Sequence, residues 1–254
     1  MSYEIREMSF GEILDMGFRL LRNHFVLLVG IAAVFYVPFG LAVSALVDPS
    51  GPAPGPEVLL GVLGAMLLTM AIVNPIVLAA ITHAVGESYL GRAASIGGAL
   101  RVGVSILLPL IGTSILAVLA ELVGFALLVI PGVYLALAFI LLQQVIVLER
   151  VFGFTALTRS HELMKGHKLR GFGILLVTSI IMMILSTALG LFAAFVPVLG
   201  PVLEAVGQSV GYAFMSAVLV VFYFDVRCRQ EAFDLEHLAR LVEEEAGVTP
   251  APIG

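Results

Sequence analysis

Long runs of apolar residues without a charged side chain dominate the pattern of this chain. A single acidic residue, Glu121, interrupts one of these runs, which cover residues 23–47, 58–86, 102–148, 171–203 and 205–224. A bilayer core about 30 Å thick needs about 20 apolar residues in a helix to cross it. Each run is therefore long enough to span a membrane.

The run 102–148 is too long for one helix, because at a rise of 1.5 Å per residue it would extend about 70 Å. Pro131 and Gly132 lie inside it, and adjacent Pro and Gly residues mark turns. Dividing the run there predicts six spans, at approximately residues 25–47, 58–86, 102–129, 133–148, 171–196 and 203–224.

The connections between spans predict how the spans pair. The segment Asp48–Glu57 is rich in proline, which removes backbone donors and breaks helices. We therefore expect three hairpins, made of spans 1–2, 3–4 and 5–6. Segments with helical periodicity precede the hairpins at Ser9–Arg22, Ser95–Arg101 and Gly153–Gly166, and the first opens with the Ser-x-x-Glu pattern of a capping box. The predicted fold is an all-α integral membrane protein in which a cytoplasmic, interfacial amphipathic segment precedes each hairpin.

Charge placement predicts the orientation of these spans. The 13 basic residues lie at the N-terminus, between spans 2 and 3, between spans 4 and 5, and at the C-terminus: Arg6, Arg19, Arg22, Arg92, Arg101, Arg150, Arg159, Lys165, Lys168, Arg170, Arg227, Arg229 and Arg240. The positive-inside rule places both termini in the cytoplasm. We expect a cytoplasmic N-terminal interfacial helix at 1–24, a six-helix transmembrane domain at 25–224, and a cytoplasmic C-terminal helix and tail at 225–254.

Composition agrees with a membrane protein and excludes several other classes. Of the 254 residues, 60% are hydrophobic and 12% are charged, and the mean hydropathy is +1.11. Soluble domains carry about twice that share of charge. This composition excludes a soluble enzyme, a disordered chain and a basic nucleic-acid binder. The lipid bilayer is thus the first expected partner, with a cytoplasmic or membrane protein as a further one and no nucleic acid.

A candidate polar site lies within the spans. An intramembrane acid such as Glu121 costs at least ~2.5 kcal/mol, so it needs a partner, a cavity or a proton. Gln143 and Gln144 reach a similar depth from span 4, and Asn74 precedes the proline that interrupts span 2. One interpretation is a proton or substrate site made by these four residues. The other is a protonated Glu121 hydrogen-bonded to a glutamine amide.

Recognisable catalytic motifs are missing from the sequence. It contains no GxSxG, HExxH, Walker A or CxxC pattern. His83 and Glu87 are spaced i, i+4, but two ligands do not make a metal site, and an interfacial hydrogen bond is the simpler interpretation. We therefore expect no enzymatic activity, no cofactor and no metal.

Several short motifs resemble one bacterial family. They are Ser9–Asp15 with Phe18–Arg22, Ile130–Leu135, Ala156–Ser160 with Glu162–Gly166, and Phe224–Glu231 with Phe233–Leu235. In this order they are similar to the six-span family named after the membrane domain of glycerophosphoryl diester phosphodiesterases. The resemblance implies a six-span fold in a bacterial inner membrane. In fused members the phosphodiesterase chemistry belongs to a separate barrel domain, which these residues do not contain, so we expect that activity not to carry over.

The sequence leaves two functional hypotheses. The first is a non-enzymatic inner-membrane scaffold or accessory subunit that acts through its cytoplasmic face, where the charged segments gather. The second is a small transporter or permease with a polar site around Glu121, Gln143, Gln144 and Asn74.

Overall fold

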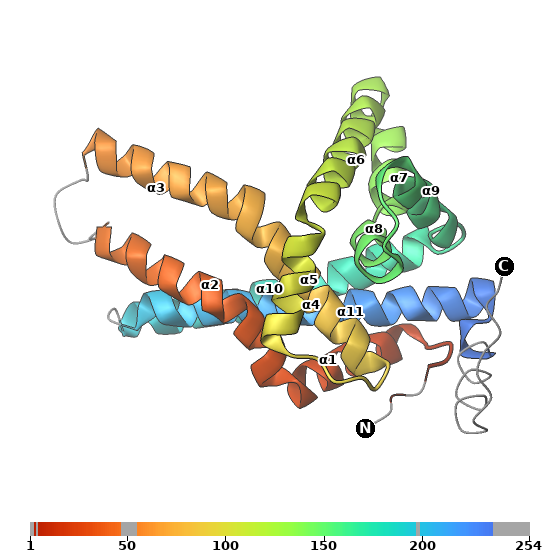
Figure 1. The fold of residues 1–254 in the computed structure, drawn as a ribbon, viewed down its shortest axis with the longest axis horizontal. Coiled ribbons are helices and arrows are strands. Elements are labelled where there is room, and N and C mark those ends of the chain that lie inside the picture. Colours follow the sequence, from red (N-terminus) through yellow and green to blue (C-terminus); the bar gives the residue numbers. More distant parts are fainter. Residues whose placement is uncertain (1–2, 4, 47–54, 197–198, 236–254) are drawn as a thin grey trace.

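The computed structural model is built of helices (Figure 1). It describes residues 3, 5–46, 55–196 and 199–235, and no strand occurs among them. In chain order the elements are α1 (Phe10–Asn23), α2 (Phe25–Leu46), α3 (Pro56–Leu68), the π-helical segment η1 (Thr69–Val73), α4 (Asn74–Tyr89), α5 (Ile96–Ser105), α6 (Leu107–Leu127), α7 (Val129–Ala138), α8 (Leu142–Gln144), the π-helical segment η2 (Val145–Glu149), α9 (Gly153–Leu163), α10 (Lys168–Phe195) and α11 (Gly200–Glu231).

Six segments of the described chain are long and apolar enough to cross a membrane. They are Phe25–Leu46, Pro56–Tyr89, Leu107–Leu127, Val129–Glu149, Lys168–Ala193 and Gly200–Glu231. The all-helical class is therefore confirmed for the described residues, and so is the expected number of segments long and apolar enough to span a membrane. The last segment crosses the expected domain boundary at residue 225 without a break, because α11 continues to Glu231.

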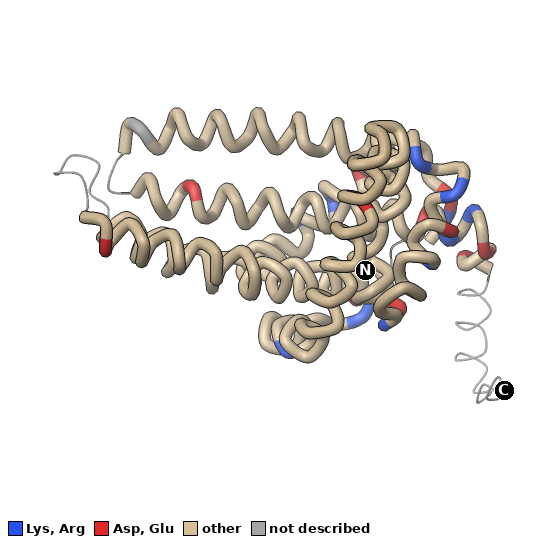
Figure 2. The backbone as a smooth tube through the Cα atoms, turned by 90° about the horizontal axis from the view of Figure 1, so that it is seen from above, with Lys and Arg blue, Asp and Glu red and all other residues tan. Residues whose placement is uncertain are grey.

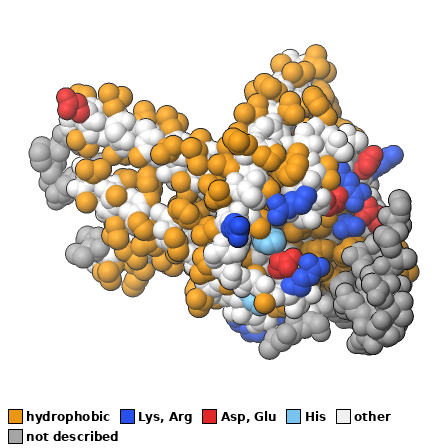
Figure 3. Space-filling model, viewed as in Figure 1, with side chains coloured by type: hydrophobic (Ala, Val, Ile, Leu, Met, Phe, Trp, Pro, Cys, Tyr) orange, Lys and Arg blue, Asp and Glu red, His pale blue; other side chains and the backbone are white. Residues whose placement is uncertain are grey.

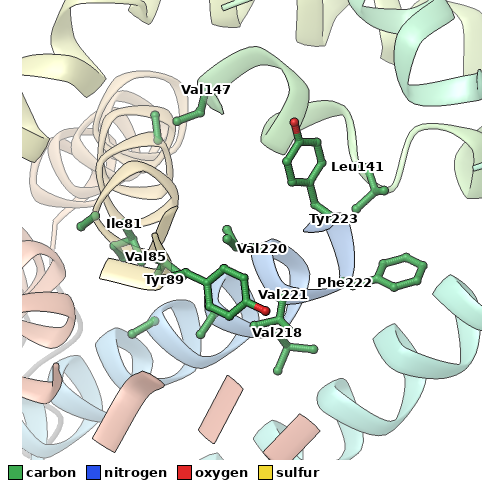
Figure 4. Packing of buried hydrophobic residues seen from close by; sticks show 14 of the residues in the cluster. Ile81, Val85, Tyr89, Leu141, Val147, Val218, Val220, Val221, Phe222 and Tyr223 are labelled. Atoms are coloured by element: carbon green, nitrogen blue, oxygen red, sulfur yellow. The ribbon is translucent and has the colours of Figure 1, made fainter. Parts of the chain in front are cut away.

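Helix α11 is the centre of the packing. Helices α1, α2, α4 and α10 all pack against it, and α2 contacts α11 far more extensively than it contacts α3. Small buried residues on α11, including Ala205, Ser209 and Ala213, allow neighbouring helices to approach closely. Figure 4 shows part of the resulting core, with buried side chains from α4, η2 and α11: Ile81, Val85, Tyr89, Val147, Val218, Val220, Val221 and Phe222.

The halves of the spans that lie away from this core stand apart from one another. Helix α3 contains no buried residue, and in Figure 1 it runs roughly parallel to α2 and points away from α6. The side chains that it exposes, such as Leu60, Leu67 and Met70 just beyond its end, are apolar. Lipid tails can cover such a surface without the cost that water would impose.

The turn between spans 3 and 4 differs from the prediction. It lies at Leu128, whose backbone is extended, and not at Pro131 and Gly132. Both of those residues belong to the first turns of α7, where proline is tolerated because its missing N–H has no helical partner. Gly132 is needed for close packing, since a Cβ there would lie 2.4 Å from the Phe125 ring.

Two of the spans are interrupted. In span 2 the π-helical segment η1 ends directly before Asn74 and Pro75, so the irregular turn absorbs the hydrogen bond that the proline cannot make. In span 4, residues 139–141 separate α7 from α8, which leads into η2. The two interruptions belong to spans that both pack near α6.

Basic side chains gather at one end of the long helices. Figure 2 shows Lys and Arg in this region, whereas the opposite tips of α2, α3 and α10 carry none in the described chain. The segregation seen along the sequence is therefore also a segregation in space. We refer to this part of the molecule, with α1, α9 and the last turns of α11, as the basic end.

Candidate functional site

A pocket of about 460 Å³ lies where the two interrupted spans approach α6. Its walls come from η1 and α4 on one side, from α6 on another, and from the region between α7 and η2 on the third. Three of the four sequence-predicted polar residues, Asn74, Glu121 and Gln143, line it. The fold thus brings together side chains from three spans, while Gln144 is not part of the lining.

Glu121 is half-buried and lies on α6 with Ser114 and Ala117, which also line the pocket. Within the described residues its carboxyl group has no hydrogen-bond or ion-pair partner. Gln143 Nε2 donates instead to Thr82 Oγ1 at 3.1 Å, and no hydrogen bond joins Glu121 to a glutamine amide within the described residues. The lining is otherwise largely apolar, so the carboxyl group is the most polar feature of the pocket.

Asn74 connects the interruption of span 2 to span 1. Its side-chain oxygen accepts a hydrogen bond from the Tyr36 hydroxyl group. Tyr36 in turn stacks on Tyr212 of α11, with 5.4 Å between the ring centroids. Asn74 is therefore held in place from outside the pocket, and its position is set by α2 and α11.

Gln144 has a different environment from the other three residues. Its side chain is almost fully buried, and its Oε1 atom has no hydrogen-bond partner among the described residues. An unsatisfied buried amide oxygen costs free energy. Because its side chain is buried and does not line the pocket, Gln144 belongs to the core around α8.

These groups define what the pocket can bind. A carboxyl group and two amides in an otherwise apolar cavity can fix the orientation of a small ligand. Interrupted helices around a polar cavity are also found where membrane transporters bind their substrates. Within the described residues no group of three or more His, Cys, Asp or Glu side chains is placed to hold a metal ion.

A second feature is a cluster of ion pairs and hydrogen bonds around Asp225 at the basic end. The Asp225 carboxylate is buried, accepts a hydrogen bond from the Met8 backbone N–H at 2.7 Å, and lies 3.2 Å from Arg170. Arg229 Nε lies 3.2 Å from the same carboxylate. Arg170 and Arg229 also donate to the Met8 carbonyl oxygen. The Asp225 cluster thereby joins the N-terminal arm, residues 5–9, to α10 and α11.

A third region, the Arg159 cluster, lies nearby on α9 and α11. Arg159 donates two hydrogen bonds to Glu149, at 2.8 and 3.1 Å, and a further one to Glu231. The hydrogen bond to Glu231, followed by that to Glu149, raises the pKa of Arg159 above its ordinary value. Glu231 also pairs with Arg227 at 2.8 Å. This network fixes α9 and the end of η2 against the last turn of α11.

The two charged clusters are only partly visible in the sequence. Asp225 and Arg229 are spaced i, i+4, a spacing that permits an ion pair on a helix. The contacts with Met8 and Arg170 join segments far apart in the chain, so no local sequence pattern predicts them. The carboxylates of Glu149 and Glu231 are likewise brought to Arg159 only by the packing of three elements.

Comparison of the chain with protein-family models, with curated proteins and with solved structures finds no match.

Proposed function

We propose that this chain is a non-enzymatic, multi-pass protein of a bacterial inner membrane that acts as a scaffold or accessory subunit through its basic end. The observation that carries the proposal is the Asp225 cluster. It joins the N-terminal arm, α10 and α11 by hydrogen bonds and ion pairs, an arrangement that favours a pre-organised surface at the basic end. A rigid surface loses less conformational entropy when a partner binds.

The finer topology belongs to the same proposal. The positive-inside rule favours a cytoplasmic position for the basic end, and with it for both termini. On this view α1 lies along the cytoplasmic leaflet, with exposed Phe10 and Phe18 directed to lipid and Ile13 and Gly17 against the protein. We also propose that the spans form successive hairpins and that the chain is a member of the six-span family that its motifs resemble.

Co-purification of the full chain in mild detergent, without crosslinker, tests the scaffold proposal. Glu162 and Lys165 are exposed at the basic end, so the double variant Glu162→Lys, Lys165→Glu reverses the charge at both positions without changing the net charge, and it leaves the two clusters intact. Glu57 is exposed near the other ends of the spans, and Glu57→Lys serves as the matched control.

The proposal expects a reproducible set of partner proteins with the unmodified chain and with Glu57→Lys, and loss of that set with the double variant. A chain that purifies alone contradicts the proposal. So does a partner set that the double variant retains in full, because binding would then occur elsewhere.

The pocket around Glu121 favours a second candidate function, the transport of a small polar or cationic solute. Glu121 has no partner within the described chain, so its cost in the membrane is uncompensated by the protein. Residues retained at a cost to stability are typical of functional sites. For this function, uptake by proteoliposomes should be lost with Glu121→Gln and retained with Glu204→Gln, an exposed acid in α11 outside the pocket.

Thermal unfolding separates this candidate from a structural role for Glu121. Glu121→Leu leaves no hydrogen-bonding partner unsatisfied within the described residues, and it removes a polar group from an apolar pocket. We therefore expect the melting temperature of this variant to equal or exceed that of the unmodified chain. A lower melting temperature would show that the carboxyl group stabilises the fold. Uptake that Glu121→Gln leaves unchanged would exclude the transport candidate at this pocket.

A further inference from the structure

A separate pocket of about 260 Å³ opens at the basic end, where three spans end next to one another. Its walls come from the last turns of α4, from η2, and from the last turns of α11. On the face shown in Figure 3, basic side chains gather beside a histidine and acidic side chains. Neither the Glu121 pocket nor the Asp225 cluster includes this site.

The lining of this pocket has an excess of positive charge. Three arginines, Arg92, Arg150 and Arg227, line it, whereas Glu87 is the one carboxylate among the lining residues that the structure describes. Arg92 pairs with Glu87 at 3.2 Å, and Arg227 pairs with Glu231 beside the pocket. These two pairs leave the charge of the third arginine without compensation in the described chain.

Arg150 is the residue that distinguishes this pocket. Within the described residues it makes no hydrogen bond and no ion pair. Its backbone is left-handed, with φ 59° and ψ 33°, in a position after a helical segment where glycine is usually found. A side chain at such a position costs conformational energy. The left-handed backbone at Arg150 therefore carries a conformational cost at a position that contributes a cation to the pocket lining.

Arg227 shows that the site is ordered before a ligand binds. Its guanidinium group lies 4.1 Å from the centre of the Phe233 ring and donates to Glu231 at 2.8 Å. The Tyr223 hydroxyl, 3.4 Å from Arg227, is itself held by Glu149. An arginine held in this way can present its remaining N–H groups to an anion with little further loss of entropy.

From this geometry we infer that the pocket binds a phosphate-bearing anion. Planar guanidinium groups match the oxygens of a phosphate in paired hydrogen bonds. Basic pockets between transmembrane helices on the cytoplasmic side are also suited to anionic lipid headgroups. The shared chemistry is the phosphate group, carried by a lipid headgroup or by a soluble anion. This inference does not depend on the proposed scaffold function.

Thermal unfolding of the purified full chain in a non-ionic detergent tests the inference, because a ligand that binds the folded state raises the melting temperature. One arm adds sodium phosphate, with sodium chloride at equal ionic strength as its reference. The other adds phosphatidylglycerol to the micelles, with phosphatidylcholine as its reference. Arg150→Gln removes the unpaired charge, and Arg101→Gln removes an exposed charge of the basic end outside the pocket.

We expect phosphate, phosphatidylglycerol or both to raise the melting temperature of the unmodified chain and of Arg101→Gln. Arg150→Gln should need about 10- to 100-fold more ligand for the same rise, as for the loss of one charged hydrogen-bonding partner. A response to phosphatidylglycerol alone identifies a lipid headgroup as the source, and a response to phosphate identifies a soluble anion.

Arg150→Gly distinguishes loss of binding from loss of folding, because glycine adopts the left-handed conformation readily and the variant should stay folded. It should melt no lower than the unmodified chain without ligand and should still lose the response. The inference is overturned if neither ligand exceeds its reference, or if Arg101→Gln and Arg150→Gln weaken the response equally.

Discussion

The buried carboxylate of Asp225 lies 3.2 Å from the guanidinium group of Arg170, so the last turns of α11 are fixed to the first turn of α10. The same carboxylate accepts a hydrogen bond from the backbone N–H of Met8 and forms an ion pair with Arg229. One side chain therefore holds three segments together at the basic end. If this end is the working surface of the protein, its rigidity depends on Asp225.

Replacing Asp225 by asparagine should destabilise the protein strongly. The change keeps the size of the side chain but leaves Arg170 and Arg229 beside each other without their shared counter-charge. We expect a loss of about 3 kcal/mol in unfolding free energy, at the lower end for a broken buried pair because both arginines reach solvent. Denaturant unfolding in detergent measures this loss.

Asp15→Asn is the matched control for that measurement. Asp15 also pairs with an arginine, Arg19, at 3.0 Å, but both side chains are exposed. Such surface pairs contribute about 0–1 kcal/mol. Equal effects of the two substitutions would contradict the central role given to Asp225.

A close approach between α1 and α11 gives a second prediction. A Cβ atom on Gly17 would lie 2.6 Å from Val218 Cγ2 and 3.1 Å from its Cα atom. Gly17→Leu should therefore push α1 away from α11 and cost about 2–3 kcal/mol of unfolding free energy. Limited proteolysis should then cut within residues 10–23 faster.

Gly11→Ala provides the comparison on the same helix. Nothing lies within 4 Å of a Cβ at Gly11, and alanine favours a helix by up to about 1 kcal/mol over glycine. This variant should resist proteolysis as well as the unmodified chain. If Gly17→Leu resisted equally well, α1 would not be packed on α11 through Gly17.

The capping box of α1 should respond to pH. Its hydrogen bond with Ser9, together with the nearby Arg6, lowers the pKa of Glu12 from 4.5 to about 2. Since the folded pKa is depressed, the contribution of Glu12 to the helix is fully present above about pH 4.5 and is lost as the pH falls towards 2. Hydrogen exchange in residues 9–16 should accelerate over this range, after correction for intrinsic rates.

Glu12→Gln should remove that pH dependence. The amide oxygen can still accept from the Ser9 N–H, which now bonds to Glu12 at 2.7 Å, but glutamine does not titrate. An unchanged acid-dependent opening in Glu12→Gln would assign the effect to another group.

Local sequence patterns predicted the spans and the start of α1. Apolar runs of sufficient length gave six spans, and the Ser9–Glu12 capping box is present with both of its hydrogen bonds. In each case the signal lies within a few neighbouring residues or in composition alone. Physical rules for helix length and helix ends are enough to predict the spans and the start of α1.

The turn between spans 3 and 4 and the partner of Glu121 could not be read in this way. Pro131 marks a turn in many sequences, but proline is equally compatible with the first turn of a helix, and the chain reverses at Leu128. Gln143 reaches a depth similar to that of Glu121, yet its amide meets Thr82 of α4. Depth along a span does not specify which face of a neighbouring helix lies opposite.

Tertiary packing also decides which helix is central. All six spans are apolar, so composition gives no reason to single out α11. Its many small residues, with Gly17 of α1 against Val218, allow neighbours to approach it from several sides. The Asp225 cluster belongs to that packing, because Met8 lies just before α1, which packs against α11, and donates its backbone N–H to the Asp225 carboxylate.

The most direct test of the account is the side of the membrane on which the basic end lies. Single cysteines are introduced by Ser50→Cys, between spans 1 and 2, and by Ser95→Cys, at the basic end, on a Cys228→Ala background. Intact cells are then treated with a membrane-impermeant thiol reagent. The account expects labelling at position 50 and none at position 95 until the cells are opened. Labelling at position 95 but not at position 50 in intact cells would contradict it.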